Sequence, residues 1–187
     1  MNAICNYAYI PVRNEPSESA EMETQILYGE TFSVLETRDK WKRIRIDFDG
    51  YEGWIDAKLH TTIDNDTYNA YIAQKRHIVS KAFTSIEPND YNHSLIITGG
   101  SEVLTPTPSP MDNVIETARL FLGAPYLWGG RTFFGIDCSG FSQIVYKIHG
   151  LAIPRNASQQ VKLGTTVNFL KEIQPVIWRS LVMMSPR

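Results

Sequence analysis

The first 60 residues contain four short segments rich in β-branched and aromatic residues, and turn-forming residues separate them. This combination is typical of β-strands. The four segments are residues 7–12, 25–37, 41–48 and 51–59. Turn signals occur at 14–17 and at 47–50, and the second of them predicts a hairpin. Because so many short strands leave unpaired edges unless the sheet closes on itself, residues 1–60 predict a small β-barrel.

The second half of the chain predicts helices. Residues 61–110 mix helical and strand signals and end with three prolines in five positions, an extended linker composition that marks a domain boundary. Beyond the prolines, Asp112 is a candidate N-cap for an apolar helical segment that stops at Gly123. Residues 138–150 predict a second helix with Gly150 as its stop signal. The predicted fold class is therefore α+β.

Composition narrows the classes of partner. The 187 residues carry 18 Lys and Arg against 20 Asp and Glu, a formal net charge of -2, so we expect no binding to nucleic acid or to an anionic membrane. No apolar run approaches the roughly 18 residues needed to cross a bilayer, and the first residues lack a secretory pattern. The two cysteines lie far apart, which argues against a disulfide framework. We expect a cytoplasmic protein, or a periplasmic or secreted one if an upstream signal peptide has been lost.

Cys138 lies where an irregular, glycine-rich loop meets the second predicted helix. The free N–H groups and the partial positive charge of a helix N-terminus favour a thiolate, which is the attacking species in nucleophilic catalysis. The same N–H groups can stabilise an oxyanion. Taken alone, a single cysteine is more often a small buried hydrophobic residue than a nucleophile, so this feature by itself favours the structural interpretation.

Three ordered motifs surround this cysteine: PYLWGG at 125–130, DCSGF at 137–141 and LAIPRNASQQ at 151–160. Together they resemble the NlpC/P60 family of cysteine peptidases, papain-like enzymes that cut the stem peptides of peptidoglycan. Residues 10–30 and 41–56 resemble the bacterial SH3 domain that precedes the peptidase in one branch of this family. That branch contains γ-D-glutamyl-L-diamino acid endopeptidases, also called dipeptidyl-peptidase VI, which release L-Ala-γ-D-Glu from trimmed peptides.

The resemblance implies three parts. Residues 1–60 form a bacterial SH3-like barrel, residues 61–110 a second SH3-like remnant or a linker, and residues 111–187 a truncated NlpC/P60 catalytic domain. The expected fold is an N-terminal SH3-like β-barrel followed by the front half of a papain-like domain. The expected partner is a murein tripeptide or a related wall peptide, and no metal or organic cofactor is implied. The exact diamino acid and the oligomeric state stay open.

The resemblance also implies roles for individual residues. Cys138 matches the nucleophile, and Tyr126 matches the tyrosine that lines the site and supports the oxyanion or the substrate backbone. Asp137 and Ser139 match positions that hold the amine and carboxylate region of the substrate. Glu21, in the SH3-like part, takes the acidic position that could approach the substrate amine across the domain interface. A solvated loop carboxylate explains Glu21 equally well.

The sequence after the cysteine helix matches the family only in part. Arg155 and Gln159 fall in a matching stretch, where a structural role is at least as good an explanation as a substrate contact. The catalytic base of the family is a histidine on a later strand, but only His149 follows Cys138, and it lies in the same predicted helix. At about 1.5 Å per residue it is roughly 16 Å away along the helix axis, out of reach of the sulfur.

Residues 176–187 also differ from the family, whose members continue with Gly-Asp-Leu and an apolar strand. One added nucleotide permits Gly-Asp-Leu-Ala-Phe-Phe in another reading frame, so we expect a frameshift after Pro175, with a native apolar strand as the alternative. We expect a cysteine peptidase by family that is inactive as this chain; the alternative is a non-catalytic SH3-type module that binds wall peptides. We also expect the cysteine helix to keep a partly exposed apolar stripe of Phe141, Ile144, Val145 and Ile148.

Overall fold

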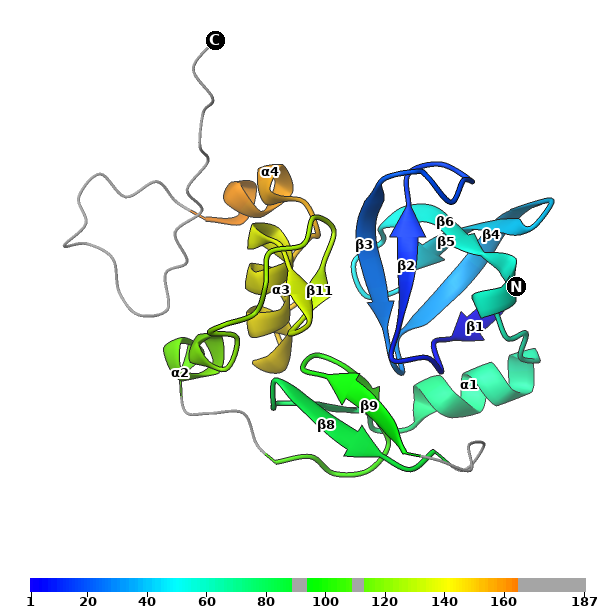
Figure 1. Cartoon of the computed structure of the whole chain (residues 1–187). Coiled ribbons are helices and arrows are strands. Elements are labelled where there is room, and N and C mark those ends of the chain that lie inside the picture. The colour runs from blue at the N-terminus through cyan, green and yellow to red at the C-terminus, as the bar shows by residue number, and fades with distance from the viewer. Residues whose placement is uncertain (89–93, 109–112, 165–187) are drawn as a thin grey trace, which may run out of the picture.

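The computed structural model describes residues 1–88, 94–108 and 113–164, and Figure 1 shows their arrangement. A strand-rich half lies beside a half built around one helix, α3 (Cys138–Ile148). The predicted α+β class is confirmed. No helix in these three ranges is long and apolar enough to cross a bilayer. The predicted frameshift after Pro175 and the tail at 176–187 lie outside the described residues.

A six-stranded antiparallel sheet forms the strand-rich half, with the strand order β1-β4-β5-β6-β2-β3. Its strands are β1 (Asn2–Ile4), β2 (Tyr9–Arg13), β3 (Met22–Leu27), β4 (Thr31–Arg38), β5 (Trp41–Ile46) and β6 (Glu52–Asp56). The sheet curls around one core of fully buried side chains, among them Ile10, Ile26, Phe32, Ile44 and Ile46. The hairpin predicted at 47–50 joins β5 to β6, and Gly50 takes a positive φ of 73° in its turn.

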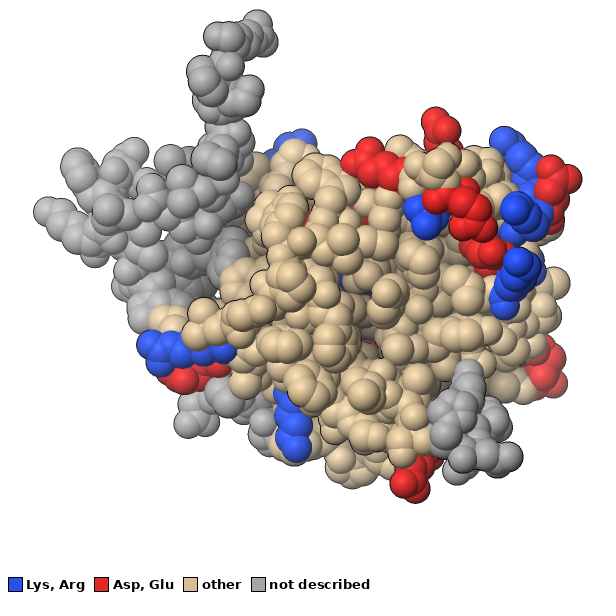
Figure 2. Space-filling model, in the orientation of Figure 1, with Lys and Arg blue, Asp and Glu red and all other residues tan. Residues whose placement is uncertain are grey.

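Charged side chains on the face shown in Figure 2 gather over the sheet half, and they mix both signs. Exposed ion pairs of the sheet half include Arg43 with Glu52 and Arg38 with Glu36. The area over α3 carries few charges in the same view. This face therefore offers no large single-sign field to a charged partner.

Most of residues 61–110 is described, and Tyr71 and Glu102 of this segment contact the β3–β4 turn. After a short 3-10 turn (Ala57–Leu59), its elements are α1 (Asn65–Ala73), β7 (His77–Ile78), β8 (Phe83–Ile86), β9 (Leu95–Thr98) and β10 (Glu102–Val103). The Tyr71 hydroxyl donates to the carbonyl oxygen of Gly29 at 2.8 Å. Gly29 has a φ of 79°, and a Cβ there would lie 2.0 Å from the carbonyl oxygen of Glu102, so only glycine fits this contact. The two predictions for this segment, an SH3-like remnant and a linker, both stay predictions.

The helical half follows most of the local signals, but its first helix ends at Arg119, before the stop predicted at Gly123. Its elements are α2 (Val114–Arg119), β11 (Arg131–Thr132), β12 (Gly135–Ile136), α3, α4 (Ala157–Gln160) and a 3-10 turn (Val161–Leu163). Cys138 begins α3, and Gly150 follows the helix with a φ of 77°, as predicted. Asp112 lies outside the described residues, and the Asn113 side chain caps α2 by accepting the N–H of Glu116 at 2.9 Å.

The expectation of a partly exposed stripe on α3 is wrong for three of its four residues, and only Phe141 stays partly buried. Ile144 and Val145 are completely buried, and Ile148 is 4% exposed. Leu27 of β3 and Phe121 belong to the same hydrophobic cluster and cover the helix. Each such buried side chain contributes about 1.5–3 kcal/mol to folding. The covering residues come from distant parts of the sequence, which local periodicity does not reveal.

Candidate active site

A pocket of about 290 Å³ opens where the sheet half meets the N-terminal end of α3. Four of the residues predicted from the sequence line it together: Tyr126, Asp137, Cys138 and Ser139. The other lining residues are Glu23 and Tyr51 from the sheet half, Trp128 from the loop before α3, and Arg155, Asn156, Ala157 and Ser158 from the segment after it. Four separate parts of the sequence therefore meet at this pocket.

Cys138 is exposed at the first position of α3. Asp137 is the N-cap of the helix, and its Oδ1 accepts the N–H of Gly140 at 2.7 Å. The N–H groups of the first helical turn have no intrahelical acceptors, so the backbone at Cys138 and Ser139 presents donors beside the thiol. A carbonyl attacked by this sulfur develops its negative charge next to them. Cys5, by contrast, is completely buried in the sheet core, where burial raises the pKa of its thiol far above the ordinary value.

The Asp137 carboxylate is buried and bonded by five protein donors. Arg155 donates through Nη1 to Oδ1 at 3.0 Å and through Nη2 to Oδ2 at 2.5 Å. The N–H groups of Gly129 and Gly140 and the Ser139 hydroxyl supply the other three hydrogen bonds. A carboxylate offers about four lone-pair sites, so Asp137 keeps little capacity for a substrate group. Asp137 and Ser139 line the pocket with buried side chains, and their binding of the substrate stays a prediction.

Arg155 joins the two walls of the pocket. Its Nε donates to Oγ1 of Thr24 in β3 at 3.0 Å, while its other nitrogens hold the start of α3. The second contact of this segment comes from Gln160 rather than Gln159. The Gln160 amide donates to the carbonyl oxygen of Ser139 at 2.9 Å, whereas Gln159 is exposed. The structural role considered for this stretch therefore rests on Arg155 and Gln160.

Tyr126 stands at the open rim of the pocket. Its side chain is 68% exposed, and its backbone forms a parallel bridge with Ile136 of β12. Desolvation and the neighbouring groups of Cys138 and Asp137 raise the pKa of the Tyr126 phenol above its ordinary value. The hydroxyl thus keeps its proton at neutral pH and is able to donate to an oxyanion.

The acidic residue on the sheet wall is Glu23 rather than Glu21. Glu23 lines the pocket and accepts a hydrogen bond from the Tyr51 hydroxyl at 3.0 Å. Burial, followed by the adjacent Glu23 charge, raises the pKa of Tyr51 to about 12, so this donor stays protonated. Glu21 precedes β3, where its carbonyl oxygen accepts the N–H of Asn14 and its side chain is exposed. Local signals do not define the first residue of β3, and a shift of two positions decides which glutamate enters the pocket.

Glu23, Tyr51 and Trp128 are pocket residues that the sequence did not identify. Trp128 is 59% exposed, which is unusual for so large an apolar side chain. Its position inside the PYLWGG motif, next to Cys138 in the expected site, was the available signal. Tyr51 directly follows the 47–50 turn, and no local signal distinguishes it from the core tyrosines of a barrel.

None of the described histidines lines the pocket. His149 lies at the opposite end of α3, where its Nε2 hydrogen-bonds the Thr117 hydroxyl at 2.8 Å. His60 belongs to the sheet half and His77 to β7, while His93 lies outside the described residues. Across the described ranges, no group of three or more His, Cys, Asp and Glu side chains is placed to hold a metal ion.

Two family models match the chain in the two halves described above. A model described as a bacterial dipeptidyl-peptidase SH3 domain matches residues 12–58. A model described as the NlpC/P60 family matches residues 123–175. The first match covers most of the curled sheet, and the second covers the pocket loop, α3 and the segment after it.

Three curated relatives are named dipeptidyl-peptidases, and two of them share one name. The chain is 29% identical to a γ-D-glutamyl-L-lysine dipeptidyl-peptidase of Bacillus cereus, over 79% of this chain and 56% of that protein. It is 30% identical to the protein of the same name from Bacillus subtilis, over 78% of this chain and 60% of that protein. Dipeptidyl-peptidase 6 of Lysinibacillus sphaericus is 25% identical over 84% of this chain and 73% of its own length. The chain thus spans little more than half of the two Bacillus relatives.

Solved structures share the fold. A crystal structure of an NlpC/P60 family protein from Bacillus cereus matches with a TM-score of 0.80 and 21% identity, over 94% of this chain and 81% of that chain. An NlpC/P60 endopeptidase from Photobacterium damselae matches with a TM-score of 0.62 and 17% identity, over 85% of this chain and 45% of that chain. At these identities the likeness concerns the fold: an SH3-like sheet followed by part of an NlpC/P60 domain.

Proposed function

We propose that this chain is a cysteine peptidase that hydrolyses the bond between γ-D-Glu and the diamino acid in peptidoglycan stem peptides. It carries a bacterial SH3 domain followed by an NlpC/P60 domain. The observation that carries the proposal is the exposed Cys138 thiol at the start of α3, inside a pocket that the SH3 domain helps to form. The names of the Bacillus relatives support wall-derived peptides as substrates. A murein tripeptide beginning with L-Ala-γ-D-Glu is the finer form of the proposal.

The chemistry begins with attack of the Cys138 thiolate on the γ-carbonyl carbon, which forms a C–S bond and leaves an oxyanion. The N–H groups at the start of α3 and the Tyr126 hydroxyl stabilise this oxyanion. Its collapse breaks the C–N bond, and the departing amine of the diamino acid takes up a proton from solvent water. Water then hydrolyses the thioester, which releases the dipeptide and returns the thiol.

Glu23 suits recognition of the free amino terminus. A dipeptidyl-peptidase fixes the distance between the N-terminus and the scissile bond, and a carboxylate is the side chain that pairs with an ammonium group. Glu23 lines the same pocket as Cys138, and the Tyr51 hydroxyl holds its carboxylate. Acylation of the substrate amine removes the charge with which Glu23 pairs, so we expect the pocket to prefer free amino termini.

Peptide binding without cleavage is the second candidate function. The observation in its favour is that no described histidine lines the pocket, although a positioned acid–base group contributes typically about 10²–10⁴-fold to such reactions. The recognition residues serve either function. Binding by the SH3 domain alone has less support, because Leu27 of its strand β3 packs into the cluster that covers α3.

We place the protein in the cytoplasm as part of the same proposal. Cys5 and Cys138 are both free thiols in the structure, a state that reducing compartments preserve. A cytoplasmic enzyme of this specificity would act on wall peptides that are being recycled.

A protection assay tests the pocket. The chain is labelled with iodoacetamide in the presence of L-Ala-γ-D-Glu-L-Lys, and peptide mapping follows Cys138 over time. We expect the γ-linked tripeptide to slow labelling of Cys138, and the α-linked isomer to have no effect. The Cys5→Ala variant is the matched control, because it removes the other thiol and leaves the pocket intact. Unchanged labelling at millimolar tripeptide contradicts the proposal.

A cleavage assay separates the two candidate functions. Release of L-Lys from the same tripeptide is followed by mass spectrometry for the wild-type chain and for Cys138→Ala. Protection of Cys138 together with release that depends on Cys138 supports the peptidase. Protection without release supports the binding function.

A further inference from the structure

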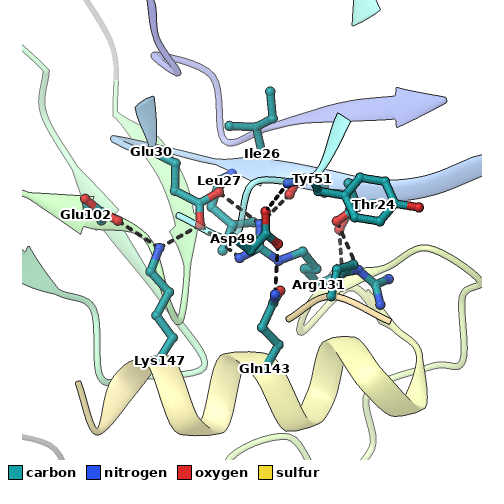
Figure 3. A network of polar contacts seen from close by, with 12 residues as sticks. Thr24, Ile26, Leu27, Glu30, Asp49, Tyr51, Glu102, Arg131, Gln143 and Lys147 are labelled. Carbon is teal, nitrogen blue, oxygen red and sulfur yellow. Dashed lines mark hydrogen bonds and ion pairs between the residues drawn. The ribbon is translucent and has the colours of Figure 1, made fainter. Parts of the chain in front are cut away.

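A cluster of buried charges lies between the sheet and α3, and Figure 3 shows its contacts. Glu30, in the β3–β4 turn, accepts two hydrogen bonds of 2.9 Å from Arg131 of β11. It also accepts one of 2.6 Å from Lys147 of α3. Lys147 pairs in turn with Glu102 of β10 at 2.9 Å. We call these four residues the Glu30 cluster.

The cluster is almost entirely shielded from water. Glu30 and Arg131 are at most 1% exposed and Lys147 is 3% exposed. Burial alone raises the pKa of Glu30, but the charges of Arg131 and Lys147 lower it to about 2. The Phe48 ring lies against both cations, 4.4 Å from Nζ of Lys147 and 5.6 Å from the Arg131 guanidinium. Ion pairs buried so deeply often stabilise a fold no better than apolar side chains of the same shape, which points to a role in geometry.

Arg131 connects the cluster to both sides of the pocket. The backbone N–H of Arg131 donates to Oε1 of Gln25 at 2.7 Å, and its side-chain Nη1 donates to the carbonyl oxygen of Gln25 at 2.6 Å. Gln25 lies in β3, two residues after Glu23. Arg131 itself begins the β11–β12 hairpin that leads directly into Cys138. Arg131 therefore joins β3, which carries Glu23, to the hairpin that leads into Cys138.

Lys147 and Gln143 hold α3 itself against the sheet half. The two residues lie one helical turn apart, and the Gln143 amide donates to Oδ2 of Asp49 at 2.9 Å (Figure 3). On the pocket side, a Cβ at Gly129 would lie 2.4 Å from the carbonyl oxygen of Met22. The loop before α3 thus touches β3 with no space between them, and a small shift of β3 moves one pocket wall against the other.

We propose that Glu30 is a positioning residue for peptide recognition, which fixes the separation between the Glu23 carboxylate and the Cys138 thiol without touching the substrate. The inference rests on the proposed function, in which Glu23 receives the free amino group. Loss of the Glu30 charge leaves Arg131 and Lys147 free to reorient, so that β3 shifts relative to α3. The spacing between the two ends of the pocket then no longer fits a dipeptide.

The test measures two dissociation constants by titration calorimetry on full chains that carry Cys138→Ala, which prevents turnover. The peptides are L-Ala-γ-D-Glu-L-Lys and its N-acetylated form. The ratio is the dissociation constant of the N-acetylated peptide divided by that of the free peptide. A charge-assisted contact at Glu23 makes this ratio about 10–100 in the reference chain. In Glu30→Gln we expect the ratio to fall below about 3, because the contact is lost. Partial unfolding raises the apparent dissociation constants of both peptides by the same factor, so the ratio reports the geometry of the pocket rather than the stability of the fold.

Glu102→Gln is the matched control, since Glu102 pairs with Lys147 and Arg76 but forms no hydrogen bond to Arg131 among those of the described residues. We expect it to keep the ratio of the reference chain. If Glu30→Gln keeps that ratio, or if both variants lower it equally, the inference is overturned and the proposed function stands. If Glu30→Gln does not fold, Glu30→Asp, whose shorter side chain pulls the carboxylate away from Arg131 and Lys147, is judged by the same two outcomes. A ratio near one in the reference chain overturns amine recognition and the inference together, while protection of Cys138 still decides whether the pocket binds the peptide.

Discussion

Replacing Arg155 with methionine removes a buried guanidinium that joins both walls of the pocket. Arg155 is 2% exposed, and it donates to Thr24 on one side and to Asp137 on the other. Breaking a buried ion pair by deleting one partner costs about 3–5 kcal/mol, because the other charge stays buried without compensation. Asp137 keeps the N–H groups of Gly129 and Gly140, so we expect the low end, about 3 kcal/mol of the free energy of unfolding.

Urea unfolding followed by tryptophan fluorescence measures this loss. With a slope of about 1–3 kcal/mol per molar urea, the midpoint falls by about 1–3 M. Arg38→Met is the matched control, because Arg38 pairs with Glu36 at the surface, where the two side chains are 58% and 39% exposed. Such pairs are worth at most about 1 kcal/mol. A loss below about 1 kcal/mol for Arg155→Met, or equal losses in both variants, would refute the reasoning.

Iodoacetamide labels Cys138 faster than Cys5 near neutral pH, because Cys5 is fully buried and burial raises the pKa of its thiol; timed peptide mapping checks the order, and faster labelling of Cys5 contradicts the nucleophile assignment. The purified 187-residue chain cleaves L-Ala-γ-D-Glu-L-Lys at least about 10²-fold more slowly than a full-length Bacillus relative, since no described histidine lines the pocket; comparable rates would overturn this. Acid lowers the free energy of unfolding as pH falls from about 4.5 towards 2. The pKa of Glu30 is about 2 in the folded chain and has its ordinary value in the unfolded chain, so the unfolded chain binds the proton first. Thermal unfolding across this range should show a weaker dependence in Glu30→Gln, and identical profiles would count against the ionised Glu30 cluster.

Local sequence signals were sufficient for both ends of α3, which carries the nucleophile, and for one hairpin of the sheet half. The start of α3 at Cys138, its end before Gly150 and the hairpin at 47–50 all follow from residues within a few positions of each feature. Caps, glycine stops and turns depend on backbone conformation and on hydrogen bonds between near neighbours, so a short stretch of sequence contains the information. The order of the motifs along the chain likewise indicated both kinds of domain.

Tertiary structure alone decided which residues form the pocket and which residues cover α3. It placed Glu23 rather than Glu21 on the sheet wall, and it covered the α3 stripe with Leu27. The bond from Arg155 to Thr24 spans 131 positions, and the pair between Arg131 and Glu30 spans 101. Such contacts leave no periodicity in the sequence, because each side chain meets its partner only after the sheet has curled and α3 has packed against β3. Burial of these charges is also a property of the packed interface, since the same residues on a separate domain would face water.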